Sequence, residues 1–275
     1  MRLSIHHRTD YRFSEPQAKV VQLLRLTPQS HAGQNVIDWR IDVNCNARLR
    51  FGRDGFGNVT TMLYVEGPID GLALTVNGEV LTEDRAGMIV GVGEPLPPAV
   101  FLQVSPYTRA DEAIGAVAAE VAAAGGTALD RAHRLNSAVH ARLRLDPGRR
   151  SGALGAAETL AEGHGMAQDF AHVFIAAARS IGMPARYVAG HVFRRDRPGH
   201  LEEAAHAWAE AHVEGYGWIG FDPTTDRCPC DRYVRVATGL DYRDAAPLSG
   251  MRTGGGVEEL EVGVRVGLAG GAAQD

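Results

Sequence analysis

A histidine and an aspartate near the middle of the C-terminal half are the residues best placed to do chemistry. His206 begins the stretch "HAWAEAHVE", which alternates as a strand does, and Asp222 ends the short strand expected in "GWIGFDPTTD". An imidazole can take a proton from a nucleophile, and a carboxylate can fix the tautomer of that imidazole. Taken singly, each also has a structural interpretation, because strand histidines are often hydrogen-bonded core residues and Asp-Pro commonly begins a turn.

The stretch "EGHGMAQDFAHVF", residues 162–174, is typical of a helix start prepared for a nucleophile. Gly163 and Gly165 allow a tight approach, and the run that follows is amphipathic. A thiol at such a helix N-terminus would have a lowered pKa. However, the position that would carry the thiol is Ala167, and a methyl group cannot form a thioester.

Four further side chains could line a site formed by these three positions. They belong either to the first turns of the expected helix or to the strand of the histidine: Gln168, Asp169, His172 and Trp208. Gln168 and Asp169 could instead only complement the helix dipole, and tryptophans most often serve packing. The sequence leaves both readings open.

Other chemistries are less well supported. The cysteines, Cys45, Cys228 and Cys230, form neither a disulfide framework nor a zinc set, so we expect free thiols in a reducing compartment. Cys228 and Cys230 follow Asp222 on an expected loop, without a helix N-terminus to lower their pKa. Metal-dependent hydrolysis would need the histidines His164, His172 and His206, which are more simply a chance collection. We expect no metal and no cofactor.

Composition narrows the function classes. The 275 residues, with 45% hydrophobic and 22% charged content, suit a globular protein with room for two domains. The net charge of -5 and the scattered Lys and Arg residues argue against nucleic acid as a partner. The N-terminus shows no signal pattern, and no window approaches the roughly 18 apolar residues of a membrane span. We therefore expect a cytoplasmic protein without membrane contact.

The elements that must position these residues fall into two parts. Residues 1–95 alternate with period two, as in Leu3 and Ile5 or Leu72 and Leu74, and indicate a β-sandwich or barrel. The turn signals are "FGRDGFGN" and the Asn77-Gly78 pair, which predicts a hairpin. The proline-rich segment 91–106 then predicts a connection.

From residue 105 the period becomes helical. Asp111 is expected to cap one helix, a second follows with Leu129 to Leu143, and a third runs from about Ala167 until Gly182 and Pro184 stop it. The stretch "ARYVAGHVF" predicts a strand. Near the end, residues 255–267 predict a last strand that needs a sheet to join, and residues 268–275 a flexible tail. Its expected inward residues are Leu260, Val262, Val264 and Val266.

Three ordered stretches resemble the bacterial transglutaminase-like proteins. They are "GHGMAQDFAHVFIAAARSIGMPARYVAGHV", "EAAHAWAEAHVEGYGWIGFDPTTD" and "YVRVATGLDYRDAAPLSGMRTGGGVEELEVGVRV". In that family the first motif usually runs Gly-Val-Cys-Gln-Asp, which puts the catalytic cysteine at Ala167 and Met166 in the preceding slot. The resemblance covers nearly the whole chain, because the β-rich first part also looks like the family's N-terminal domain.

The resemblance implies an α+β fold: an N-terminal β-sandwich or barrel-like domain, then a papain-like transglutaminase core over residues 105–248. It implies that a thiolate attacks the amide of a peptide or protein substrate, and that water or an amine resolves the thioester. His206 would be the general base and Asp222 its orienter. With Ala167 the chain would be inactive as written, whether the replacement is engineered or natural. The alternative is a natural pseudoenzyme that binds a peptide or protein partner in the retained cleft.

Two further expectations concern the surroundings of the site. Substrate specificity would lie in cleft loops such as "RRDRPGHLEE", whose shape does not follow from composition. Exposed β edges in the first domain make a dimer compatible with the sequence.

Overall fold

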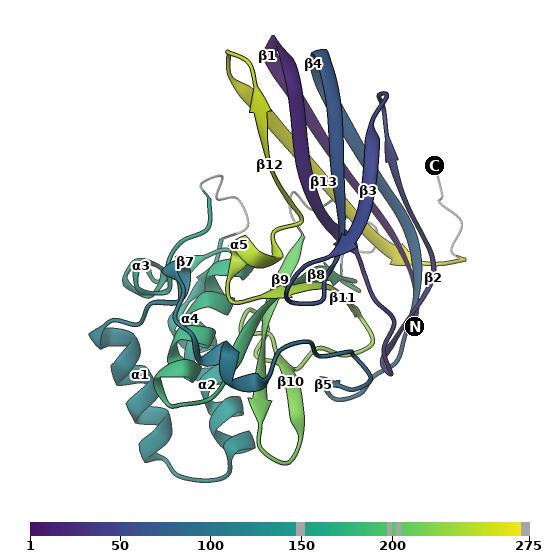
Figure 1. Ribbon diagram of the computed structural model, residues 1–275. Coiled ribbons are helices and arrows are strands. Elements are labelled where there is room, and N and C mark those ends of the chain that lie inside the picture. Colours follow the sequence, from purple (N-terminus) through teal and green to yellow (C-terminus); the bar gives the residue numbers. More distant parts are fainter. Residues whose placement is uncertain (147–151, 197–199, 202–204, 271–275) are drawn as a thin grey trace.

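The computed structural model describes residues 1–146, 152–196, 200–201 and 205–270, and has the expected α+β architecture. A β-rich part rises above a part in which helices cover a second sheet (Figure 1). Among the described residues, no helix combines the length and the apolar character that a bilayer crossing requires. The two parts pack directly against each other, since Leu3, Ile5 and Val264 of the first sheet belong to the hydrophobic cluster of the second part.

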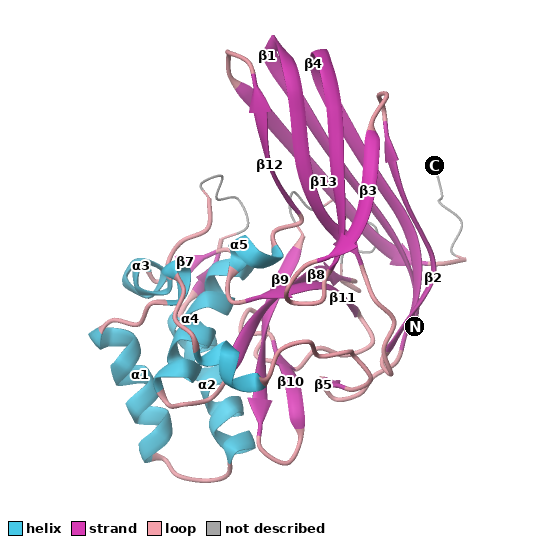
Figure 2. Ribbon diagram, viewed as in Figure 1, coloured by secondary structure: helices cyan, strands magenta, loops and turns pink. Residues whose placement is uncertain are grey.

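Two very long strands organise the β-rich part, β1 (Arg2–Thr27) and β4 (Val59–Thr82), which pair antiparallel along most of their length (Figure 2). On the outer side of β4 lie β2 (Gln34–Val43) and β3 (Arg48–Arg53). On the outer side of β1 lie β12 (Leu248–Thr253) and β13 (Glu258–Leu268). The last strand of the chain thus returns to the first.

Register shifts in the middle of β1 and β4 give this sheet its sandwich-like core. Between Arg12 and Lys19 the buried positions of β1 change from odd to even residue numbers, and β4 changes likewise after Val65. Such a shift turns the inward side chains to the other face of the ribbon. Both halves nevertheless share one hydrophobic cluster, which contains Tyr11, Phe13, Val20, Leu24, Leu63, Val65, Leu72 and Leu74. The ribbon therefore folds over and encloses its own core.

The hairpin predicted at Asn77-Gly78 is wrong. Both residues lie inside β4, where Ile5 pairs with Gly78 and His6 with Asn77. The glycine is explained by packing, because a Cβ atom at position 78 would collide with the Trp39 ring. The turn predicted in "FGRDGFGN" does occur, between β3 and β4.

The second part is an antiparallel five-stranded sheet covered by helices. The strands, in the order of the sheet, are β11 (Tyr233–Gly239), β8 (Ala185–Val192), β9 (His206–Val213), β10 (Gly217–Phe221) and β5 (Met88–Ile89). The helices are α1 (Glu112–Ala123), α2 (Ala128–Arg142), α3 (Ala156–Glu162), α4 (Ala167–Ser180) and α5 (Tyr242–Ala245). Short elements complete it: the 3₁₀ helices Pro98–Leu102 and Pro106–Thr108, and the parallel pair β6 (Arg144–Leu145) and β7 (His164–Gly165).

The predicted helix signals are confirmed. The Asp111 side chain accepts a hydrogen bond from the N–H of Ile114 and caps α1. Helix α4 is the central helix, with all its residues from Asp169 to Arg179 buried. It ends before Gly182, which has a φ of 73°. Glycine adopts this left-handed conformation readily because it has no Cβ atom.

The expected domain limits and the last strand differ in detail from the structure. Residues 88–89, inside the expected domain 1–95, form β5 and pair with β10 in the second sheet. In β13, Val264 and Val266 are buried, whereas Leu260, expected inward, is 53% exposed. Of the tail 268–275, residues 271–275 lie outside the described residues.

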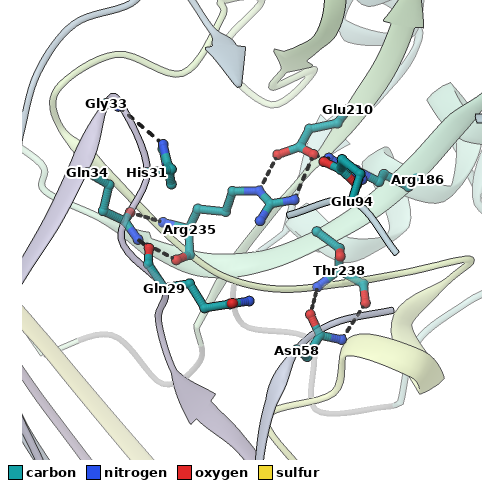
Figure 3. Close-up of polar contacts among 10 residues, drawn as sticks. All are labelled: Gln29, His31, Gly33, Gln34, Asn58, Glu94, Arg186, Glu210, Arg235 and Thr238. Carbon is teal, nitrogen blue, oxygen red and sulfur yellow. Dashed lines mark hydrogen bonds and ion pairs between the residues drawn. The ribbon is translucent and has the colours of Figure 1, made fainter. Parts of the chain in front are cut away.

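Two carboxamide side chains of the β-rich part bind the backbone of β11, the edge strand of the second sheet (Figure 3). The Gln34 amide donates to the Arg235 carbonyl at 2.9 Å and accepts from the Arg235 N–H at 2.8 Å. The Asn58 amide donates to the Thr238 carbonyl at 2.7 Å and accepts from its N–H at 2.8 Å. These four bonds fix the β-rich part to the second sheet.

A buried ion cluster lies beside these amides (Figure 3). Glu210 is fully buried and accepts hydrogen bonds from Arg186 at 2.6 Å and Arg235 at 2.7 Å. Arg186 also reaches Glu94 at 2.6 Å, in the connection between the two parts. Burial alone would raise the pKa of Glu210, but Arg235 and Arg186 together lower it to about 2.

We expect Glu210→Ala to destabilise the protein by about 3 to 5 kcal/mol, because two buried guanidinium groups lose their shared partner. Urea unfolding at neutral pH measures this loss. Glu120→Ala is the matched control, since Glu120 pairs with Arg142 at the surface and should contribute less than about 1 kcal/mol. Equal losses for the two variants would contradict the role given to Glu210.

Candidate active site

The structure brings His206 and Asp222 together at the edge of neighbouring strands. Because β9 and β10 are antiparallel, the beginning of β9 at His206 lies beside the residue that follows β10, Asp222. His206 Nε2 lies 2.8 Å from Asp222 Oδ2. Both side chains are buried, His206 at 8% and Asp222 at 0% exposure, so this hydrogen bond is protected from water.

Asp222 is held by three further hydrogen bonds. The Tyr233 hydroxyl donates to Oδ2 at 2.7 Å, and the Thr224 N–H and hydroxyl donate to Oδ1 at 2.9 and 2.6 Å. Burial would raise the pKa of Asp222, but the His206 imidazole and the hydrogen bonds from His206, Thr224 and Tyr233 lower it to about 2. The carboxylate is therefore ionised at neutral pH.

An ionised Asp222 determines the state of the imidazole. A carboxylate only accepts, so Nε2 of His206 carries a proton, and in the neutral imidazole the lone pair is on Nδ1. Among the described residues, Nδ1 has no hydrogen-bond partner. His206 can therefore act as a base through Nδ1 toward a group bound beside it.

Tyr233 and Thr224 were not predicted from the sequence. Thr224 had a local signal, because an Asp followed two residues later by a free N–H is typical of an Asx turn. Tyr233 had none, since it reaches Asp222 from another strand, β11. Burial raises the pKa of Tyr233, so its hydroxyl stays protonated and donates.

Ala167 is the first residue of α4. In the part of the chain that the structure describes, the N–H groups of Ala167 and Gln168 have no acceptor, as is usual in the first turn of a helix. These groups and the positive end of the helix dipole favour negative charge at this point. Gly165 precedes the helix because a Cβ there would come within 2.9 Å of the Asp169 side chain.

Asp169 and His172 support α4 from inside. The Asp169 carboxylate accepts from the N–H groups of Met166 and Leu154, at 2.9 and 2.8 Å. His172 Nδ1 donates to the Leu154 carbonyl at 2.9 Å, and Nε2 accepts from the Tyr242 N–H at 3.1 Å. Both side chains are thus committed to holding the loop before α3 and the helix start.

A cavity of about 150 Å³ opens beside His206, between the two parts of the protein. Gln168 borders it, so the residue next to Ala167 and the imidazole face the same space. The other lining residues are His7, Tyr11, Tyr187, Ala189, Ala205, Tyr242, Pro247, Leu248, Leu260 and Val262. Asp169, His172 and Trp208 do not line it. Trp208 is fully buried behind His206, with 6.2 Å between the ring centroids.

The alternative nucleophiles and metal ligands are placed elsewhere. Burial raises the pKa of the Cys228 thiol to about 11, the opposite of what a nucleophile needs. His164 lies 3.6 Å from Asp146, and His172 is hydrogen-bonded at both nitrogens. Within the described ranges, no group of three or more His, Cys, Asp or Glu side chains could hold a metal ion.

We expect the protein to lose stability steeply between pH 6.5 and 4. Burial, with a smaller effect of His6, lowers the pKa of His7 from 6.5 to about 4. Burial lowers the pKa of His172 to about 4, and burial with His7 and His206 lowers that of His191 to about 3. The unfolded chain therefore binds more protons in this window, and stability that is full above pH 6.5 falls as pH decreases. Each histidine costs about 2 kcal/mol at pH 5.

Urea unfolding at pH 7, 6 and 5 measures this dependence. The slope of unfolding free energy against pH reports the number of protons taken up on unfolding, and His191→Leu should lower that number by about one. His200→Leu, at an exposed histidine, should leave the slope unchanged. A flat profile in the parent chain would show that these histidines do not stay neutral inside it.

Both parts of the chain match family models, and relatives align with nearly its whole length. Residues 115–223 match the transglutaminase-like superfamily, and residues 3–81 match the bacterial transglutaminase-like N-terminal region. An uncharacterized protein of Mycobacterium leprae is 31% identical, over 96% of this chain and 98% of that protein. An uncharacterized protein of Mycobacterium tuberculosis is 27% identical, over 91% and 87%. The crystal structure of a "Putative Cysteine Protease from Cytophaga hutchinsonii" shares the fold, with a TM-score of 0.78, 20% identity, and coverage of 99% and 92%.

Proposed function

Because the chain belongs to the transglutaminase-like superfamily, we propose that it is built as a thiol amide hydrolase or acyl transferase in which Ala167 occupies the nucleophile position. The observation that carries the proposal is the hydrogen bond between His206 and Asp222. It leaves Nδ1 of His206 without a partner among the described residues, beside the cavity that Gln168 borders. The substrate class is a peptide or protein amide. As written, the chain holds such an amide without cleaving it.

With a cysteine at position 167, each group has a defined role. Nδ1 of His206 takes the thiol proton, and the thiolate sulfur attacks the amide carbon to form a C–S bond. The N–H groups at the start of α4 bind the oxyanion that develops on the carbonyl oxygen. The imidazolium then gives its proton to the amine as the C–N bond breaks, leaving a thioester. Water or an amine attacks the thioester, gives its proton to His206, and releases the thiolate.

Asp222 acts on the reaction through His206. Its negative charge stabilises the imidazolium that forms after the first proton transfer, and its Oδ2 holds the ring in the required tautomer. Tyr233 and Thr224 keep this carboxylate ionised and fixed. They are positioning residues.

A binding function is the second candidate. It is favoured by the cavity of about 150 Å³ beside His206 in a chain that has Ala167 at the helix start. In this case the protein is a natural pseudoenzyme, and the retained cleft binds a peptide or protein partner.

Restoring the thiol separates the two candidates. The Ala167→Cys protein should hydrolyse peptide amides or transfer their acyl groups. A trapped thioester, detected as an increase in the mass of the intact protein, would identify position 167 as the nucleophile. A folded Ala167→Cys protein that binds peptides without turnover would instead support the binding function. The parent chain, with Ala167, is the control for both measurements.

A further inference from the structure

Apart from His206 itself, the cavity beside His206 has an uncharged lining. Its walls combine aliphatic side chains with tyrosines, and no described residue that lines it is Asp, Glu, Lys or Arg. Burial raises the pKa of Tyr11 to about 12, so its hydroxyl stays uncharged, and His7 is neutral at physiological pH because burial lowers its pKa to about 4. A charged group that entered would lose hydration without gaining a charged partner from these walls.

The size of the cavity sets the size of its occupant. Its volume is about 150 Å³. An apolar cavity of about 150 Å³ accepts a benzene molecule, so this one has room for a side chain such as that of leucine, methionine or phenylalanine. The occupant would be in contact with the imidazole that the proposed reaction uses, because His206 forms part of the wall.

Both parts of the protein build this cavity. Tyr187 and Ala189 come from β8 of the second sheet, whereas Tyr11 comes from β1 and Leu260 with Val262 from β13 of the β-rich part. The strand β13 pairs with β1 along its length, so these residues are held by a sheet and not by a loop. Leu260 is 53% exposed although it belongs to this wall, which leaves its side chain accessible to an occupant.

We propose that this cavity is the specificity pocket for a neutral, apolar side chain next to the amide that binds at His206, and that β1 and β13 set this preference. The proposal rests on the proposed function, because a pocket beside His206 selects substrates only if amides bind there. The proposal assigns substrate specificity to strands of the β-rich part, in place of the loop "RRDRPGHLEE" expected from the sequence. Residues 197–199 and 202–203 of that loop lie outside the described residues.

The test uses one peptide in which each position is replaced in turn by Leu, Phe, Gly, Glu or Lys. Turnover is measured as kcat/KM with Ala167→Cys, and binding as Kd with the parent chain. At one position, Leu or Phe should be favoured over Glu or Lys by about 100-fold in both measurements. Turnover or binding without such a position would overturn the pocket and leave the proposed function standing.

Two matched variants locate the preference in the cavity. Leu260→Trp should fill the space and weaken Leu and Phe peptides by about 10-fold or more, without weakening the Gly peptide. Leu268 of β13 is 51% exposed and does not line the cavity. Leu268→Trp should therefore weaken neither the Leu and Phe peptides nor the Gly peptide. Equal effects of the two variants would also overturn the pocket.

The two measurements keep the failures apart. Absence of turnover by a folded Ala167→Cys protein refutes the thiol reaction, but the Kd values of the parent chain still decide the pocket. If no peptide of the series binds the parent chain, the pocket and the peptide-binding function fail together.

Discussion

Ala167→Cys is expected to raise amide turnover by about 10⁴-fold or more over the parent chain, because loss of the nucleophile leaves only binding and oxyanion stabilisation. The new thiol would lie at the N-terminus of α4, where unpaired N–H groups and the helix dipole stabilise a thiolate. In such surroundings thiol pKa values fall from about 8.5 to roughly 3.5–7.5. The rate of the new thiol's reaction with iodoacetamide should therefore differ between pH 6 and pH 8 by at most about 25-fold, and by only about 2-fold if the thiol pKa is about 6.

Site-specific alkylation followed by mass spectrometry measures this. An ordinary thiol of pKa about 8.5 would react roughly 80-fold more slowly at pH 6 than at pH 8. Cys228 provides an internal control, because burial raises the pKa of its thiol to about 11 and its reaction should be slow at both pH values. If the thiol at position 167 shows the ordinary 80-fold dependence in a folded protein, the assignment of this position is refuted.

Asp222→Asn, made in the Ala167→Cys protein, is expected to lower kcat by about 10⁴-fold while the fold is retained. The amide has nearly the same shape as the carboxylate, but it carries no charge to stabilise the imidazolium and no longer fixes the Nε2 proton. Because the pKa of Asp222 is lowered to about 2, the carboxylate should remain ionised over the whole pH range in which the protein stays folded. Steady-state kinetics on a peptide substrate measures the loss.

Tyr233→Phe is the graded companion of this variant. It removes one of the hydrogen bonds to Asp222 Oδ2 and leaves the charge, so a loss of about 10-fold is expected, with KM nearly unchanged. Substitution of Trp208 would test packing behind His206 and is a poor control, since its ring also contacts Tyr233. A loss for Asp222→Asn no larger than that for Tyr233→Phe would show that the charge of Asp222 has no special role.

Local signals in the sequence predicted the helices and the proximity of His206 and Asp222 well. Asp111 capping α1 and Gly182 ending α4 act within a few residues, so their effect can be read from neighbouring letters. His206 and Asp222 belong to consecutive antiparallel strands, which places their neighbouring ends together once the strands are recognised. The same locality explains why Asp169 could be assigned to the first turn of α4, although only the structure shows its role as a cap.

The contacts that depend on distant segments could not be predicted in this way. Asn77-Gly78 has the letters of a hairpin, but long-range pairing with β1 and the Trp39 ring keep the chain extended there. The cavity combines strands from opposite ends of the chain, and Leu260 faces it because of the register of β13 with β1. No spacing in the sequence encodes that register.

The Gln34 and Asn58 amides also cover the backbone of the edge strand β11. An edge strand with free N–H and C=O groups is a template on which another chain can add a strand and start aggregation. The two amides bind the N–H and C=O groups of Arg235 and Thr238 on β11, so these groups are not free to pair with another strand. A fragment limited to the helices and the second sheet would expose this edge to other chains. Such a fragment is therefore expected to aggregate more readily than the intact pair of sheets.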